Sequence, residues 1–212
     1  GWSFIKKAGT IILLSTILVW FTTYFGWVDG SFTMLEAEQL DDSILAAIGG
    51  VIAPIFAPLG WGNWKMAVAA VTGLIAKENV VATFGVLFGF AEVAEDGAEI
   101  WGTLATTMTA VAAYSFLVFN LLCAPCFAAM GAIKREMNNT KWFWFAILFQ
   151  NIFAYVVTLC VYQIGTLVTT GAFGVGTVVA FLFVIGFIYL LFRPYKESET
   201  LEVHMKGMAG AK

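Results

Sequence analysis

The chain has 212 residues, of which 60% are hydrophobic and 12% are charged, and its formal net charge is −3 at pH 7. Soluble domains carry roughly 25% charged residues, so this composition excludes a water-soluble domain of this size. It predicts an all-α, polytopic membrane protein, a transmembrane helix bundle in lipid, with no nucleic-acid partner. Three cysteines are too few for a disulfide framework.

Six apolar stretches follow one another along the chain, and a helix needs about 20 such residues to cross the hydrocarbon core. They are Ala8–Phe25, Ile44–Gly60, Trp64–Phe90, Gly102–Leu122, Lys141–Ile164 and Val175–Phe192. The second is short and contains Pro54 and Pro58, so it is either a broken span or a re-entrant segment. We therefore predict a transmembrane domain over residues 1–192, with about six membrane segments and broken or re-entrant helices. A polar cytoplasmic tail follows over residues 193–212.

The basic residues indicate which side of the membrane each loop occupies. Six crossings threaded from a cytoplasmic N-terminus place these basic residues on the cytoplasmic side: Lys6, Lys7, Lys65, Lys134, Arg135, Lys141, Arg193, Lys196, Lys206 and Lys212. The loops on the outer side then contain acidic residues and no Lys or Arg. Because basic residues concentrate in cytoplasmic loops, we expect a multi-pass protein with both termini in the cytoplasm.

Charged residues interrupt the third apolar stretch near its middle. Lys77 and Glu78 come 13 and 14 residues after Trp64, which is about 20 Å along a helix at 1.5 Å per residue. A charge at that depth costs at least about 2.5–3.5 kcal/mol, and such residues usually mark ion pathways. We interpret Lys77, Glu78 and the adjacent Asn79 as part of an ion pathway. The alternative is a buried ion pair that only holds the helices together.

The stretch "NLLCAPCFAAMGAIKRE" places two cysteines on either side of an Ala-Pro pair. Pro125 lacks an N–H group, so a continuous helix should break there, and Cys126 should begin the next helix. The N-terminus of a helix favours a thiolate, which is the form that binds metals. Sulfur ligands suit Fe(II), Zn(II) or Cu(I), and broken helices are a feature of transporter binding sites.

Two other interpretations of these cysteines stay open. Cys123 and Cys126 have the C-x-x-C spacing of redox pairs, although no thioredoxin-like strand–helix pattern surrounds them. They could equally be inert buried thiols, since free cysteine is among the most buried residue types. Cys160 has no companion in sequence, and we interpret it as a core residue.

Three motifs resemble the ferrous iron transporter family FeoB, in the order in which that family carries them. They are "GWSFIKKAGTIILLSTI", "TGLIAKENVVATFGVLF" and "LLCAPCFAAMGAIKRE". The resemblance implies that Cys126, after Pro125, is the gate cysteine and that Glu78 is the family's glutamate. It leaves open whether Cys123 joins the metal site.

The resemblance also implies a function and partners. The chain would form the second gate half of an Fe²⁺ transporter in the inner (cytoplasmic) membrane, and would not itself be an enzyme. It contains no G-x-x-x-x-G-K-[ST] motif, so GTP would act only through an N-terminal GTPase domain outside this chain. The expected partners are that GTPase domain, the first gate half, a small cytoplasmic accessory protein and further copies in a homo-oligomer.

The alternative functions are a gate-domain nucleoside-type transporter and a membrane thiol oxidoreductase that uses Cys123 and Cys126. Because the chain begins with Gly1 rather than Met, we expect it to be part of a longer protein.

Overall fold

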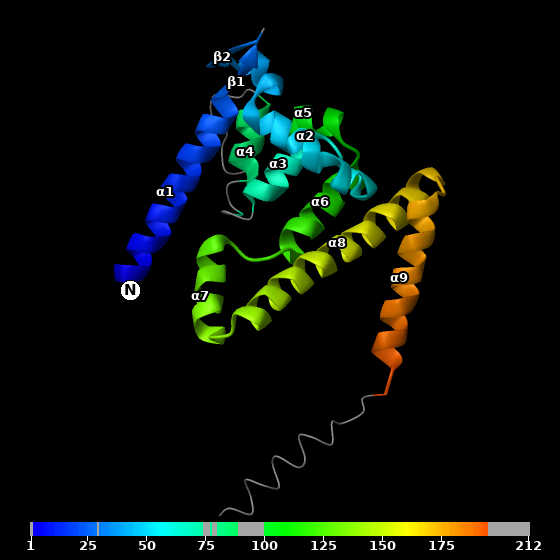
Figure 1. The fold of residues 1–212 in the computed structure, drawn as a ribbon. Coiled ribbons are helices and arrows are strands. Elements are labelled where there is room, and N and C mark those ends of the chain that lie inside the picture. Colours follow the sequence, from blue (N-terminus) through cyan, green and yellow to red (C-terminus); the bar gives the residue numbers. More distant parts are fainter. Residues whose placement is uncertain (1, 29, 74–76, 78–79, 89–99, 195–212) are drawn as a thin grey trace, which may run out of the picture.

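The computed structural model describes residues 2–28, 30–73, 77, 80–88 and 100–194, and helices make up most of this part of the chain (Figure 1). The helices are α1 (Trp2–Tyr24), α2 (Ile44–Phe56), α3 (Trp64–Thr72), α4 (Val80–Leu87), α5 (Trp101–Thr107), α6 (Ala110–Leu122), α7 (Phe127–Met137), α8 (Thr140–Thr170) and α9 (Val175–Phe192), with two short 3-10 helices, η1 (Ala37–Asp42) and η2 (Ala57–Leu59). By length and composition, α8 and α9 can each cross a membrane, and two bent helix pairs are further candidates. The predicted all-α membrane bundle with broken helices is thereby confirmed.

A small β-hairpin directly follows α1 and was not predicted. Its strands β1 (Phe25–Val28) and β2 (Ser31–Met34) pair antiparallel, with Val28 opposite Ser31. Gly30 has φ +80, a conformation that glycine adopts without strain. An Asp-Gly dipeptide between two apolar stretches is a strong hairpin signal, so this element was readable from the sequence.

The proline-containing segment α2–η2 ends in a tip, Ala57–Leu59, of which Leu59 is buried, and the chain bends by 93° before it enters α3. Pro54 and Pro58 cannot donate hydrogen bonds to the helix, so carbonyl groups near the tip need other donors. Side chains from two other helices lie at these carbonyls. Tyr155 Oη donates to Ile55 O at 2.7 Å, Gln163 Nε2 donates to Pro58 O at 2.8 Å, and Ser115 Oγ lies 2.8 Å from Leu59 O. Irregular backbone at membrane depth is tolerated where protein covers it, and α6 and α8 cover this tip.

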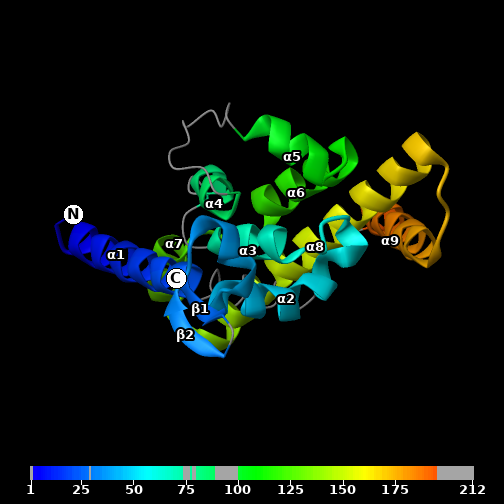
Figure 2. The ribbon, with the colours of Figure 1, turned by 90° about the horizontal axis from the view of Figure 1, so that it is seen from above.

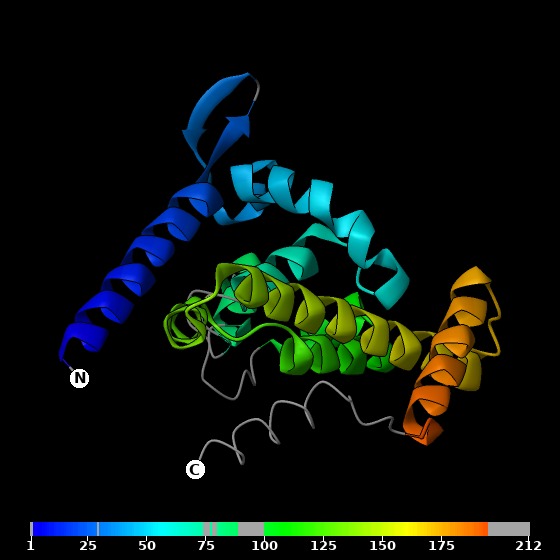
Figure 3. The ribbon, with the colours of Figure 1, turned by 60° about the horizontal axis from the view of Figure 1, so that its bottom comes forward.

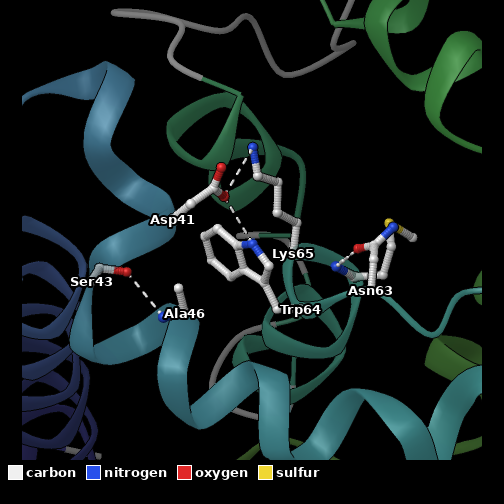
Figure 4. A network of polar contacts seen from close by, with 7 residues as sticks. Asp41, Ser43, Ala46, Asn63, Trp64 and Lys65 are labelled. Atoms are coloured by element: carbon white, nitrogen blue, oxygen red, sulfur yellow. Dashed lines mark hydrogen bonds and ion pairs between the residues drawn. The ribbon is translucent and has the colours of Figure 1, made fainter.

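The start of α3 lies beside η1 (Figure 4). Asp41 Oδ1 accepts a hydrogen bond from Trp64 Nε1 at 2.9 Å and lies 4.0 Å from Lys65 Nζ. Lys65 Nζ also lies 5.5 Å from the ring of Phe88, which directly follows α4. Lys65 at the start of α3 and Phe88 just after α4 therefore lie close together, so α3 and α4 form a hairpin.

This hairpin corrects the predicted threading. The predicted stretch Trp64–Phe90 is therefore not one continuous span, and the predicted placement of Lys65 on the side opposite Asp41 is wrong. In Figure 1 the start of α1, the helix α7 and the end of α9 lie toward one end of the molecule, and the β-hairpin lies toward the other.

The predicted span Gly102–Leu122 is broken as well. A bend of 106° separates α5 from α6, and Thr109 caps the second helix by accepting a hydrogen bond from Ala112 N at 3.2 Å. The expectation of one continuous helix here is wrong. The signal was present in the sequence, because a threonine before an apolar run is a common start of a helix.

The helices α1, α8 and α9 are longer than these short ones. At 1.5 Å per residue, the 31 residues of α8 extend about 46 Å, more than the hydrocarbon core requires. α9 packs against the C-terminal part of α8 near the turn that joins them and then diverges, whereas the N-terminal half of α1 projects away from the other helices (Figures 2 and 3). A buried cluster inside the bundle contains Trp61, whose ring stacks on Phe56 with the centroids 4.5 Å apart.

Candidate ion site at two helix breaks

The first helix break lies between α6 and α7, as the sequence predicts. α6 ends at Leu122, α7 begins at Phe127, and Cys126 is the N-cap of α7. Pro125 cannot donate to the preceding turn. The N–H of Ala124, which would bond Asn120 O in a continuing helix, lies instead 3.4 Å from Asn151 Oδ1. The carbonyl of Asn120 is therefore free to accept another donor.

The second helix break contains Lys77. α3 ends at Thr72 and α4 begins at Val80, so the expectation that Lys77 lies within a continuous transmembrane helix is wrong. The Lys77 ammonium donates to Asn120 O at 2.7 Å and to Cys123 O at 3.3 Å. The ammonium thus occupies the C-terminal end of α6, where the helix dipole carries partial negative charge. This contact explains how a cation is held among apolar helices.

Amide side chains surround this contact, and the sequence interpretation missed them. Gln150 Nε2 lies 3.5 Å from Cys123 O. Asn120 Nδ2 donates to Phe116 O at 2.9 Å, whereas Asn120 Oδ1 is buried and has no hydrogen-bond partner among the described residues. Gly73 permits this approach, because a Cβ atom there would lie 2.8 Å from Asn120 Oδ1. Amide residues inside apolar stretches, such as "VFNLLC" and "LFQNIF", were the available signal.

The three cysteines occupy different environments, and all are free thiols. Cys123 is buried, with Sγ 3.5 Å from Asn120 O. Cys126 is half-buried at the start of α7, and its side chain makes no capping hydrogen bond. Cys160 is buried, with Sγ 3.5 Å from Ala180 O at the contact between α8 and α9, which confirms its interpretation as a core residue.

The structure brings two of the predicted site residues together, namely Lys77 and the backbone of Cys123. Cys126 and Pro125 lie in the same break as Cys123. Glu78 and Asn79 lie outside the described residues. Within the described ranges, no group of three or more His, Cys, Asp or Glu side chains is placed to hold a metal ion. The oxygen ligands that the described residues offer at this break are backbone carbonyls and the amide side chains of Asn120, Gln150 and Asn151.

Comparisons with known proteins place the chain in a family. The family model described as "Gate: Nucleoside recognition" matches residues 5–140, about two thirds of the chain. The chain belongs to the Gate family. The matched part of the chain includes Lys77, Asn120 and the break from Cys123 to Cys126, whereas Gln150 and Asn151 lie beyond it.

Curated relatives of the Gate chain are iron transporters. It is 37% identical over 168 residues to the Fe(2+) transporter FeoB of Methanocaldococcus jannaschii, covering 78% of this chain and 24% of the relative. It is 34% identical over 157 residues to the Fe(2+) transporter FeoB of Campylobacter jejuni, covering 73% and 25%. A relative from Porphyromonas gingivalis, 29% identical over 202 residues, is named as a fusion of Fe(2+) transport protein A with FeoB, and the match covers 77% of this chain and 24% of that relative.

These matches confirm the predicted resemblance to FeoB. The chain spans about a quarter of the length of the curated relatives that it matches. No solved structure matches the chain.

Proposed function

We propose that this chain forms the second gate half of a ferrous iron transporter in the cytoplasmic membrane. The similarity to proteins named Fe(2+) transporter supports the ion. The observation that carries the proposal is that the Lys77 ammonium donates hydrogen bonds to the carbonyls of Asn120 and Cys123. These carbonyls form a site inside the bundle that stabilises a positive charge. Broken helices whose ends face an ion are typical of transporter sites.

The proposed mechanism assigns a role to each predicted residue. Cys126, as a thiolate, is a transient ligand of Fe²⁺ at the start of α7. Glu78 supplies a carboxylate or balances the charge of the ion, and Asn79 extends this polar lining. Pro125 keeps the α6–α7 break open, and Lys77 repels the ion when the pathway is closed. Cys123 offers its carbonyl, and its buried thiol is a second candidate ligand.

The partners and the orientation belong to the same proposal. Residues 1–192 form the gate domain and residues 193–212 a cytoplasmic tail. Both termini face the cytoplasm, an orientation that Lys134 and Arg135 in the last turn of α7 support. GTP turnover in an N-terminal domain drives the gate, together with the first gate half. A small cytoplasmic accessory protein is a further partner, which the fusion named in Porphyromonas gingivalis supports, and the transporter assembles as a homo-oligomer.

The test is Fe²⁺ uptake by cells that carry Cys126→Ser in the full-length transporter. We expect uptake to fall at least tenfold at unchanged expression, because a serine hydroxyl is a poorer ligand for Fe²⁺ than a thiolate. Cys160→Ser is the matched control, since Cys160 lies in the core between α8 and α9. Wild-type uptake in Cys126→Ser would remove the ligand role of this residue.

A second function, nucleoside uptake, is suggested by the description of the matching family. The same cells distinguish the two functions when they are given labelled nucleoside. Nucleosides need hydrogen-bond donors and stacking surfaces rather than thiols. Uptake of nucleoside without uptake of iron would replace the iron proposal.

A further inference from the structure

We propose that the carbonyl oxygens of Asn120 and Cys123, with the side-chain oxygen of Asn120, form a cation subsite that Lys77 occupies when no Fe²⁺ is bound. Lys77 is then an internal competitor of the transported ion. This inference rests on the proposed function, and it names a site made of oxygen atoms in addition to the cysteine ligand.

The first argument is the origin of the free carbonyls. In a continuing helix, the N–H of Ala124 would bond Asn120 O, but it is directed to Asn151 Oδ1 at 3.4 Å. Pro125 removes the next donor along the chain. The end of α6 therefore presents carbonyl oxygens that its own backbone does not satisfy. Carbonyls at the ends of discontinuous membrane helices commonly coordinate cations.

The second argument is the unpartnered oxygen beside them. Asn120 Oδ1 is buried without a hydrogen-bond partner among the described residues. A buried polar atom without a partner destabilises the folded state, so such an atom calls for an explanation. Only glycine at position 73 allows this close approach to the oxygen, because a Cβ atom there would lie 2.8 Å from it. A cation that enters the site would satisfy this oxygen.

The third argument is that the ammonium and the ion exclude each other. Lys77 Nζ lies 2.7 Å from Asn120 O, whereas first-row divalent ions bind oxygen at about 2.0–2.2 Å. Both cations cannot use the same oxygen, and they repel each other at short range. Fe²⁺ must therefore displace Lys77, whose flexible side chain can withdraw. In return, the ammonium balances the carbonyl dipoles when the site holds no iron.

The test measures Fe²⁺ affinity by anaerobic equilibrium dialysis of the purified full-length transporter. Lys77→Met keeps the length of the side chain and removes its charge, so we expect the Kd for Fe²⁺ to fall at least tenfold. Lys77→Arg should stay near the wild-type affinity. Lys141→Met is the matched control, because this exposed lysine at the start of α8 should not affect the Kd. A purely structural role for Lys77 predicts weaker binding or loss of folded protein, never tighter binding.

A second variant tests the oxygen itself. Asn120→Leu keeps the volume and removes Oδ1, so we expect the Kd for Fe²⁺ to rise at least tenfold while thermal stability holds or increases. Unchanged or weaker binding in folded Lys77→Met, or unchanged binding in Asn120→Leu, would overturn this inference. No Fe²⁺ binding by the wild-type transporter would instead overturn the proposed function.

Discussion

At the scale of single residues, one hydroxyl holds the tip of the proline-containing segment inside the bundle. Ser115 is fully buried, its Oγ lies 2.8 Å from Leu59 O, and it accepts a hydrogen bond from Trp61 Nε1 at 3.1 Å. We expect Ser115→Ala to lower the free energy of unfolding by about 1–3 kcal/mol, because it leaves buried polar groups without a partner. Thermal unfolding of the full-length transporter in detergent measures this loss.

The control for this prediction is Thr169→Ala. Thr169 is exposed near the end of α8, and its hydroxyl bonds only carbonyls of its own helix. Substitutions at such surface positions usually change stability by less than about 0.5 kcal/mol. If the two variants unfold at the same temperature, the Ser115 hydroxyl does not hold the tip in place.

At the scale of elements, the turn after η2 depends on a glycine. Gly60 has φ +91, and a Cβ atom on it would collide with the ring of Tyr162 on α8. We expect Gly60→Ala to destabilise the protein by more than about 1 kcal/mol, because both the backbone and the packing oppose a side chain. Gly50→Ala, on α2 with open space at its Cβ position, should be neutral or stabilising. Equal melting temperatures for the two variants would contradict this role of Gly60.

Local signals in the sequence predicted some elements well. The break at Pro125 and the span Val175–Phe192 occur where they were predicted, because a proline and an uninterrupted apolar run act within one or two helical turns. The Asp-Gly hairpin and the cap at Thr109 had comparable local signals that were overlooked.

Tertiary features were beyond the sequence. Lys77 and its acceptor Cys123 O are 46 residues apart, and nothing local relates them. Whether an apolar stretch crosses the membrane or turns back depends on which other helices its two ends contact. The hairpin of α3 and α4 is shown by the contacts of Lys65 with Asp41 and Phe88, which hydropathy does not report. The site was therefore predicted as a set of residues, whereas its geometry was not.

At the scale of the whole molecule, the short helices α2 to α7 follow one another along the chain between the long helices α1 and α8. The hairpin of α3 and α4 enters from the end of the molecule that holds η1, and its break meets the end of α6. The two breaks together place Lys77 and the carbonyls of α6 within the bundle, where neither helix alone could satisfy them. The contact between Lys77 and α6 therefore requires that the hairpin of α3 and α4 enters the bundle from the side on which Asp41 lies.

This topology makes a prediction for labelling of intact cells with a membrane-impermeant maleimide. In a cysteine-free full-length transporter, we expect Lys65→Cys to react from the same side of the membrane as Glu36→Cys, which lies beside η1. Lys141→Cys, at the start of α8, should react only from the opposite side. Six full crossings would instead group Lys65→Cys with Lys141→Cys. The result does not depend on the overall orientation, because it compares only which of the three positions react from the same side. As a control, each variant is also labelled after the membrane is permeabilised, to show that its cysteine can react.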